Sequence, residues 1–482
     1  MILVDNNKKC SAVVHFVFQN QSDSDGVPET VRPIFDASRF SEFHTFSKRT
    51  LHVWIGLGEE DSITLTHIKS AAALAAKTMR SLKQSKYQAD VSQITRLFGL
   101  DCIHDITSGI MLGLYRFEGY YQLPKEPYEY TVYLQGFESV YQNDIQEIVN
   151  KSAVVSEYVM MARDWVNTPG NILTPTTLSE RIVQQGTAVG CQATVVDAQQ
   201  AQELGMNLFL SVGLSSGYPC NLVVLRYMGN PNDSEVTALV GKGVTLDTGG
   251  YSLKTNAGLI NTKGDMGGAA AVTAAICALA KNKACATNVV AVIPVVENRL
   301  SNTSSVPGDV ITSMNGKTVE IFSSDAEGRL ILADAITYAI RIEKADRIVD
   351  VATLTGAIAN AYGSVRAGVM TNNDSFEDEL LRAGARAGEK YVDLPTDEEY
   401  QDMLKGRVAD LVNSARYGCG SIVAGLFLRE FAEDHPWIHL DIAGVSGVSK
   451  PVYEFQSEGA TGASAATMYF LLDRHFTAAD RY

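Results

Sequence analysis

Apolar positions along the first 150 residues follow two alternating patterns. Short apolar runs at 13–18, 51–57 and 130–134 predict strands. Amphipathic stretches at 62–82 and 88–98 predict helices. Because this region has no cluster of residue types that carry catalysis, we expect it to serve regulation or assembly.

A proline-rich break then marks a domain boundary. Residues 152–165 form an amphipathic pattern, and the segment 167–175 that follows contains two prolines, a glycine and two asparagines. A chain of 482 residues also exceeds what one hydrophobic core usually holds. We therefore expect an N-terminal α/β domain at 1–150, a linker helix and loop at 151–175, and a larger domain at 176–482.

From residue 176 onward strand and helix patterns alternate. Expected strands lie at 193–196, 221–227, 236–240, 288–296, 319–322, 347–354 and 437–442, and expected helices at 178–186, 198–204, 267–281, 331–341 and 420–432. The strands are continuous apolar runs, which is typical of strands that are buried on both faces. The sequence therefore predicts an α/β fold with a mainly parallel sheet covered by helices on both faces, beside the smaller N-terminal α/β domain.

Composition narrows the class of protein. A net charge of −15 repels phosphate backbones, so we expect no nucleic-acid partner. No apolar run reaches the roughly 20 residues that span a bilayer, and the N-terminus lacks a signal-peptide pattern. The seven cysteines include no C-x-x-C pair and fit free thiols in a reducing compartment. We expect a cytoplasmic protein without membrane contact.

Three glycine-flanked loops carry the candidate chemistry. Their charged residues are Lys242, Asp247, Lys254, Asp265, Asp325, Glu327 and Arg329. Asp325 and Glu327 lie two positions apart, so they can share a face only in an extended or looped segment. Ligands of parallel sheets lie beyond the carboxyl ends of strands, where these loops are expected. Four neighbouring carboxylates would repel one another, and two divalent cations would offset that repulsion.

Each of these residues also has an ordinary structural alternative. Asp247 could be a turn residue, and Asp265 and Asp325 could cap helices. Glu327 and Arg329 could form a surface ion pair, and the lysines could be solvated. The glycine-rich loop does not match the phosphate-binding pattern G-x-x-x-x-G-K-[ST]. The presence of three similar loops in one domain favours a metal site.

Histidines are absent from the stretch that holds these loops. None of the eight lies between residues 105 and 434. A Ser-His-Asp triad or a histidine-built zinc site within that stretch is therefore excluded. A metal there would be held mainly by carboxylate oxygens, with assistance from lysine.

The three loops resemble the signatures of the leucyl (cytosol) aminopeptidase family of two-metal exopeptidases. The resemblance extends over roughly 165–470 and includes segments 167–175, 307–309, 350–357 and 439–444. It implies a metallo-aminopeptidase that hydrolyses the N-terminal peptide bond of peptides, with its catalytic domain at 176–482. It also implies leucine and other apolar residues as preferred N-termini, and a homohexamer.

The metal ligands follow from the resemblance. One ion would be held by Lys242, Asp247, Asp265 and Glu327, and the other by Asp247, Asp325 and Glu327, with a backbone carbonyl at Asp325. The implied cofactors are two divalent ions per subunit, zinc or manganese, with cobalt and magnesium as alternatives. A lysine ligand needs a neutral amine, which burial beside a dication allows.

The resemblance also assigns catalytic and pocket residues. Lys254 would stabilise the oxyanion, and Arg329 would hold a bicarbonate that acts as general base towards a water bridging the metals. Thr353, Leu354 and Gly356 would line the side-chain pocket.

The chain departs from the usual signatures at three places. Ser323 and Ser324 replace Asn-Thr, segment 246–248 reads Leu-Asp-Thr instead of Phe-Asp-Ser, and Thr262 replaces a pocket methionine. Threonine makes the pocket floor smaller and more polar, so a strict leucine preference does not follow.

Two other interpretations of the function stay open. One is a two-metal phosphoesterase, and the other is an assembly or DNA-binding protein without catalysis.

Overall fold

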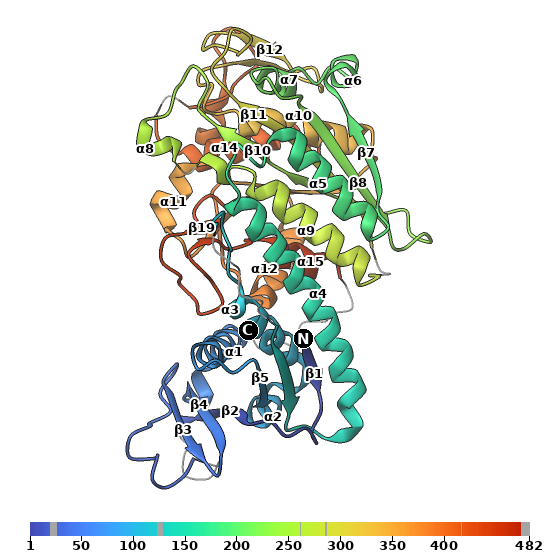
Figure 1. Ribbon diagram of the computed structural model, residues 1–482. Coiled ribbons are helices and arrows are strands. Elements are labelled where there is room, and N and C mark those ends of the chain that lie inside the picture. The colour runs from blue at the N-terminus through green and yellow to red at the C-terminus, as the bar shows by residue number, and fades with distance from the viewer. Residues whose placement is uncertain (20–26, 123–128, 261, 285–286, 416, 474–482) are drawn as a thin grey trace. The chain divides into compact units, whose positions relative to one another are not determined.

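The computed structural model (Figure 1) describes residues 1–19, 27–122, 129–260, 262–284, 287–415 and 417–473. The chain divides into two compact units. The first comprises Met1–Glu157 with Lys450–Ser457, and the second comprises Tyr158–Ser449 with the described residues from 458 onward. The boundary at residue 157 falls inside the long helix α4 (Gln142–Asn167), which begins ten residues before the predicted helix.

The N-terminal unit is built on a six-stranded sheet in the order β1-β6-β5-β2-β4-β3. Its strands are β1 (Ile2–Val4), β2 (Ala12–Phe18), β3 (Glu42–Ser47), β4 (Thr50–Gly58), β5 (Lys86–Asp90) and β6 (Thr131–Gln135). The pairings are parallel except that β3 runs antiparallel to β4. Helices α1 (Leu65–Ser81) and α3 (Cys102–Leu114) pack against each other and share one hydrophobic core with the sheet.

One helix of this unit is shorter than the sequence predicts. Residues 88–90 belong to strand β5, and the helix α2 runs only over Ser92–Phe98. Tyr87 and Ala89 are buried while their neighbours are not, which is the two-residue period of a strand. The helical stretch Ser92–Leu114 is long and apolar enough to cross a membrane, but 61% of its 18-residue apolar window is buried inside the structure, as in a core helix.

The second unit is built on a nine-stranded sheet in the order β16-β15-β18-β14-β9-β11-β8-β7, with β10 paired to β11. Its strands are β7 (Gln192–Val196), β8 (Asn221–Met228), β9 (Val236–Gly241), β10 (Gly243–Asp247), β11 (Asn288–Asn298), β14 (Arg347–Ala352), β15 (Ala367–Thr371), β16 (Tyr391–Asp393) and β18 (Trp437–Asp441). Strands β9, β14 and β18 pair in parallel, and β11 is parallel to β9 and β10. The predicted α/β fold with a mainly parallel sheet is confirmed.

Two groups of helices cover this sheet (Figure 1). One group consists of α5 (Pro175–Ala188), α9 (Gly267–Lys281), α12 (Asp374–Ala387) and α15 (Ala465–Leu472), and the other of α7 (Asn207–Gly213), α10 (Gly328–Arg341) and α14 (Gly420–Arg429). On β8, Val224 packs into the core of the second group, while the next residue, Leu225, lies against Gly186 of α5. Successive strand residues therefore point into different helical layers.

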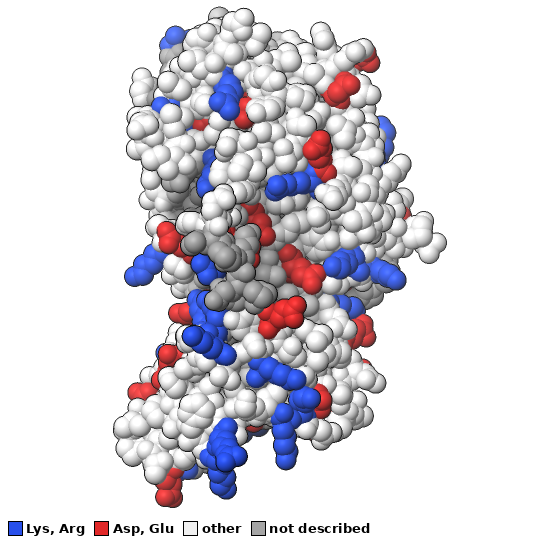
Figure 2. Space-filling view, in the orientation of Figure 1, with Lys and Arg blue, Asp and Glu red and all other residues white. Residues whose placement is uncertain are grey.

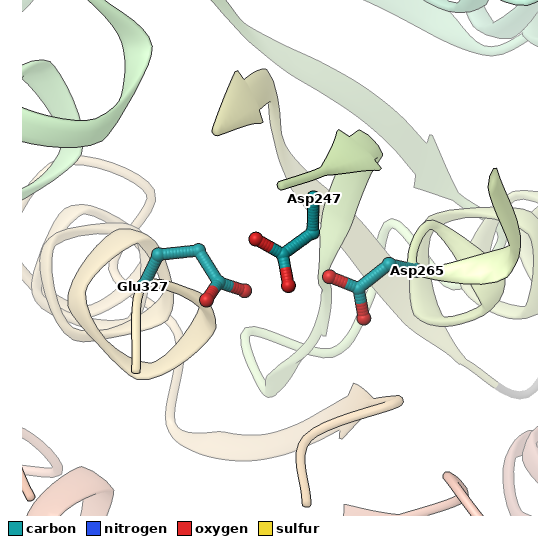
Figure 3. A group of neighbouring side chains, drawn as sticks. All are labelled: Asp247, Asp265 and Glu327. Carbon is teal, nitrogen blue, oxygen red and sulfur yellow. The ribbon is translucent and has the colours of Figure 1, made fainter. Parts of the chain in front are cut away.

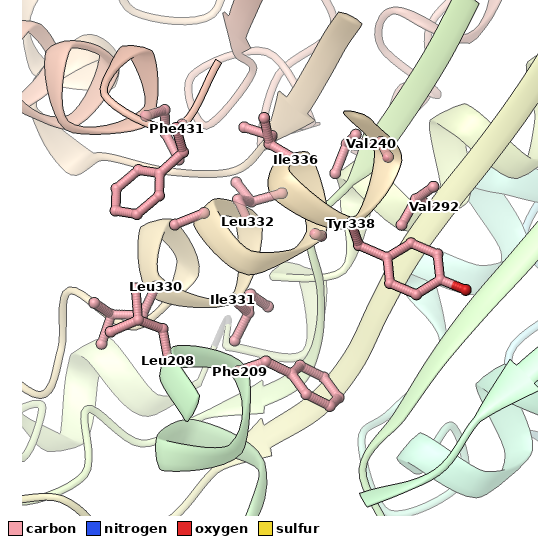
Figure 4. Packing of buried hydrophobic residues seen from close by; sticks show 14 of the residues in the cluster. Leu208, Phe209, Val240, Val292, Leu330, Ile331, Leu332, Ile336, Tyr338 and Phe431 are labelled. Atoms are coloured by element: carbon pink, nitrogen blue, oxygen red, sulfur yellow. The ribbon is translucent and has the colours of Figure 1, made fainter. Parts of the chain in front are cut away.

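The core around α10 fixes the segment that carries Glu327 and Arg329. Figure 4 shows Leu330, Ile331 and Leu332 of α10 among side chains from α7 and the central strands. These side chains have 0–1% of their surface exposed. Because this first turn is packed from several sides, the loop just before it has a defined position.

Several elements are missing from the sequence prediction. The predicted strand 319–322 corresponds to β13 (Thr318–Glu320), which belongs to a separate small sheet with β12 (Val310–Thr312) and β17 (Leu411–Val412). Strand β10 was expected to be part of a loop. Unpredicted elements of the second unit include α7, α11 (Gly356–Tyr362), β15, α12, β16, α13 (Glu398–Gln401) and α15, and those of the first unit include β1, β3, β5 and α3.

A buried ion pair joins the adjacent strands β14 and β18. His439 Nδ1 lies 2.6 Å from Asp350 Oδ1, and Trp437 Nε1 donates to Asp350 Oδ2 at 2.7 Å. Burial lowers the pKa of His439, but the charge and hydrogen bond of Asp350 outweigh burial and raise it above its usual value.

This pair predicts a loss of stability at alkaline pH. A histidine with a raised pKa in the folded state stabilises the fold below its unfolded pKa of about 6.5, and this contribution is lost as pH rises through the folded pKa. We expect the melting temperature to fall from pH 6 to pH 9 with a flatter slope in His439→Asn than in the native protein. His435→Asn is the control and should keep the native slope; equal slopes in all three proteins would contradict the prediction.

Candidate metal centre

Charged side chains from the three loops meet at one cavity of about 650 Å³ in the second unit. The predicted metal-binding, oxyanion and pocket residues that line it are Lys242, Asp247, Lys254, Asp265, Asp325, Glu327, Thr353, Leu354 and Gly356. Arg329 is the predicted site residue that does not line this cavity within the described part of the chain.

The ends of buried elements position the acids. Asp247 is the last residue of β10, which pairs in parallel with β11. Asp265 lies two residues before α9, and Glu327 immediately precedes α10. Gly328 leaves room for Lys242, because a Cβ at position 328 would lie 2.5 Å from Lys242 Cε. Because Gly328 has no Cβ, the side chain of Lys242 can pass over the first turn of α10.

Three carboxylates form the centre of the site. Asp247, Asp265 and Glu327 each offer an oxygen, and these oxygens lie within 4.8 Å of one another. Figure 3 shows the three side chains converging from three separate elements. Burial raises the pKa of Asp247 and of Asp265, and the charge of Glu327 raises both further. These raised pKa values mean that the fold disfavours the charged forms of the acids. Holding the acids together therefore costs stability.

Two lysines neutralise these acids. Lys242 Nζ lies 2.7 Å from Asp265 Oδ1 and 2.9 Å from Glu327 Oε1, and it donates to the carbonyl oxygen of Thr353 at 3.0 Å. Lys254 Nζ lies 2.5 Å from Asp247 Oδ2 and also contacts the carboxylate of Asp325. Burial lowers the pKa of both lysines, but the surrounding carboxylates outweigh burial and raise it.

The donor set fits divalent cations. Asp265 Oδ2 is buried and has no hydrogen-bond partner among the described residues, so it needs a ligand that the protein does not provide. Clustered carboxylate oxygens bind hard cations, and a bound dication would lower the pKa of Lys242 enough for its neutral amine to join them. Lys242, Asp247, Asp265 and Glu327 would hold one such ion.

Asp325 lies apart from the three-carboxylate cluster. Its side chain is 38% exposed and pairs with Lys254, while burial and the charge of Asp247 raise its pKa. We keep the prediction that a second ion is held by Asp325 together with Asp247 and Glu327.

The sequence did not point to Asn298 and Asn413, which orient the ligand loops. Asn298 Nδ2 donates to Asp247 Oδ1 at 2.8 Å and to the carbonyl of Ser324 at 3.0 Å. Asn413 accepts from the Phe322 N–H at 2.8 Å and donates to the Ser323 carbonyl at 2.7 Å. The only signal for Asn298 is its place at the carboxyl end of a strand.

The unusual Ser324 ties two of the loops together. Its Oγ donates to the carbonyl of Gly249 at 2.7 Å and accepts from the N–H of Ser252 at 2.8 Å. Ser324 therefore fixes the loop before Asp325 against the loop that carries Lys254. These two hydrogen bonds explain the serine at this position without a catalytic role.

Arg329 is buried beside the acids. Its Nη1 donates to the Asn413 carbonyl at 2.8 Å, while its Nε is buried without a hydrogen-bond partner among the described residues. Burial lowers the pKa of Arg329 to about 10, so the guanidinium stays charged at neutral pH. A buried cation with an unsatisfied donor is suited to an anion.

Comparison with known families identifies the family of this chain. The model of the cytosol aminopeptidase family, catalytic domain, matches residues 160–469, and that of the family's N-terminal domain matches residues 43–122. The chain belongs to the cytosol aminopeptidase family. It is therefore a hydrolase and a metal-dependent aminopeptidase, as the resemblance of the charged loops implied.

Relatives of the same family cover almost the whole chain. A probable cytosol aminopeptidase of Clostridium perfringens (strain 13 / Type A) is 41% identical over 426 residues, which are 88% of this chain and 86% of that protein. A probable cytosol aminopeptidase of Treponema denticola is 35% identical over 471 residues, which are 97% of this chain and 98% of that protein.

Solved structures share the fold. The bottromycin maturation enzyme BotP in complex with Mn is similar with a TM-score of 0.87 and 31% identity, covering 96% of this chain and 99% of that one. A mutant of tomato leucine aminopeptidase is similar with a TM-score of 0.87 and 26% identity, covering 98% of this chain and 96% of that one.

Proposed function

We propose that this aminopeptidase uses two divalent ions and the side chains of one cavity to cleave the N-terminal peptide bond of peptides, accepting leucine and other apolar residues. The observation that carries the proposal is the cluster of Asp247, Asp265 and Glu327 with Lys242 and the unpartnered Asp265 oxygen. Zinc or manganese is the expected pair of ions, with cobalt and magnesium as alternatives, and a homohexamer is the expected assembly.

Lys254 and Arg329 carry separate parts of the reaction. When bound, the ions polarise the scissile carbonyl and make a water nucleophilic at neutral pH. Lys254 Nζ, which faces the cavity with 23% of its side chain exposed, stabilises the negative charge that develops on the carbonyl oxygen. Arg329 would hold a bicarbonate, which would supply a general base for the attacking water. This division explains how the site works without a histidine.

Chelation tests the proposal. We expect native protein to hydrolyse leucinamide to leucine and ammonia with Mn²⁺ or Zn²⁺ present, to lose this activity in EDTA, and to recover it when either ion is added back. The melting temperature should fall in EDTA, because ions that bind only the folded state stabilise it. N-acetyl-leucinamide is the control and should not react. Full activity after exhaustive chelation would overturn the proposal.

Arg329→Ala separates the anion site from the metal site. Because no hydrogen bond or ion pair joins Arg329 to the three clustered acids in the described part of the chain, we expect this variant to keep its metal content and lose only part of kcat, by about 10²-fold, the lower end for a lost general base. Added bicarbonate should stimulate the native protein and not the variant. Metal loss in Arg329→Ala equal to that in Glu327→Ala would show that this role is wrong.

The other two interpretations have less support. A two-metal phosphoesterase would use the same acids and lysines, but the chain belongs to a peptidase family. DNA binding needs a basic surface, and on the face shown in Figure 2 basic side chains are interspersed with acidic ones. Hydrolysis of a nitrophenyl phosphate, or salt-sensitive binding to duplex DNA, would restore these alternatives.

A further inference from the structure

A serine hydroxyl that is not bonded to the described protein lies in the wall of the cavity. Ser446 lines the cavity and is only 7% exposed. Its backbone is satisfied, because its N–H donates to the Ile442 carbonyl at 2.8 Å and its carbonyl accepts from the Thr461 N–H at 3.0 Å. Its side-chain hydroxyl has no hydrogen bond to any residue in the described part of the chain. Because Ser446 lines the cavity and its hydroxyl is not bonded to the described protein, the hydroxyl is available to a ligand.

The hydroxyl lies next to the acidic cluster. A Cβ built on Gly267 would lie 2.7 Å from Ser446 Oγ and 3.2 Å from Thr353 Cγ2. Gly267 is two residues from Asp265, and Thr353 Oγ1 donates to Asp265 Oδ1 at 2.8 Å. Ser446 Oγ therefore lies beside the end of the cavity that would hold the N-terminal residue of a substrate.

The other hydroxyls nearby are already engaged as donors. Besides Thr353, Thr355 Oγ1 donates to Asp441 Oδ2 at 2.6 Å, and Thr262 Oγ1 donates to the Leu259 carbonyl at 2.9 Å. Thr262 lines the same cavity and keeps lone pairs that can accept a hydrogen bond. Together Ser446 offers a donor and an acceptor, and Thr262 offers an acceptor.

The rest of the wall supports the aliphatic part of a side chain. Val166, Leu354 and Val448 line the cavity, and Val166 and Val448 are 9% and 4% exposed. Two charged residues also line it: Lys263, whose Nζ donates to the Asn167 carbonyl at 3.0 Å, and the exposed Glu458. Because their charges are opposite, they give no net preference for a charged side chain.

We propose that the pocket selects N-terminal residues whose uncharged side chain both donates and accepts a hydrogen bond, through Ser446 and Thr262. These are hydroxyl and primary amide side chains, such as threonine and asparagine. Apolar residues are accepted by the aliphatic wall, but they leave the Ser446 hydroxyl unpaired, which costs binding energy. The inference rests on the proposed aminopeptidase function and names its substrate class.

Isosteric substrate pairs test this specificity. We compare kcat/KM for threoninamide with valinamide, and for asparaginamide with leucinamide, in native protein and in Ser446→Ala. The native protein should favour the polar member of each pair. Ser446→Ala should reduce kcat/KM for the polar member by about 3- to 10-fold, the range of one neutral hydrogen bond, and leave kcat/KM for the apolar member equal or higher, because the unpaired hydroxyl is gone. Ser449→Ala, a serine that lines the same cavity but is exposed, is the matched control and should change neither.

Two further measurements keep the outcome decisive. Because Ser446 Oγ makes no hydrogen bond within the described protein, Ser446→Ala should keep the native melting temperature. Metal-loaded protein should also bind threonine hydroxamate more tightly than valine hydroxamate, by a margin that Ser446→Ala removes. This binding test decides the inference even if no amide is hydrolysed. A lack of hydrolysis would refute only the proposed function. Equal effects on both members of a pair, or a preference for lysinamide that Glu458→Gln removes, would overturn the inference.

Discussion

Glu327→Ala is expected to lose its bound metal and nearly all turnover. Glu327 is 2% exposed, belongs to the cluster whose oxygens lie within 4.8 Å, and is assigned to both ions. Loss of an outer partner of a metal ligand already costs about 10–100-fold in affinity or activity, so loss of a shared ligand should exceed about 100-fold. The measurements are metal content by atomic emission after dialysis, and kcat for leucinamide.

The fold of this variant should survive. Removing one of the three carboxylates relieves the repulsion that raises the pKa of Asp247 and Asp265, so the metal-free variant should melt no lower than metal-free native protein. Glu399→Ala, which removes an exposed acid far along the chain in α13, is the control and should retain both metal and rate. Normal metal content in an inactive Glu327→Ala would mean that Glu327 acts on the substrate instead.

The sequence predicted helices and strands best where the composition of a segment agrees with its packing in the fold. The helix at 267–281 has the predicted bounds, because its small residues fit closely against a sheet and 14 of its residues are buried. Strand β10 was missed because its glycine and aspartate are typical of loops, whereas parallel pairing with β11 determines its conformation. Most of the elements between 356 and 411 were missed because they have seven residues or fewer, which is too short to show a period. The helix α12 has 14 residues and buries Phe376, Leu380, Ala383 and Ala387 at helical spacing, so its pattern is present in the sequence and was overlooked.

The charged residues of the site were predictable because they are concentrated in three short loops. Their supporting partners were not, because the hydrogen bonds that orient the loops join distant segments. Asn298 and Ser324 are 26 residues apart, and Asn413 is about 90 residues from the loop that it holds. Such pairs come together only after the strands have taken their order in the sheet. The local pattern of apolar and polar positions does not contain that order. The buried state of Arg329 is equally a result of tertiary packing.

Lys254→Met is expected to lose rate without losing metal. The variant keeps the length of the side chain but removes the charge that stabilises the developing oxyanion, and a lost oxyanion contact costs about 10²–10³-fold in kcat. KM should change little, because this contact strengthens only in the transition state. Metal affinity should rise or stay equal, because the ammonium of Lys254 otherwise competes with a cation for Asp247 and Asp325.

The direction of the metal change distinguishes Lys254 from the true ligands. Lys263→Met is the matched control, because Lys263 lines the same cavity but donates to a backbone carbonyl outside the acidic cluster. It should keep metal and lose less than about 3-fold in kcat, the effect of one hydrogen bond at the low end of its range. If Lys254→Met released metal as Glu327→Ala should, Lys254 would belong with the ligands, and the oxyanion would need another donor. Both lysines pair with acids, so the contacts alone do not separate their roles, and the metal measurement does. The expected result makes Lys242, buried between Asp265 and Glu327, the ligand, and Lys254, nearer the open cavity, the group that meets the substrate.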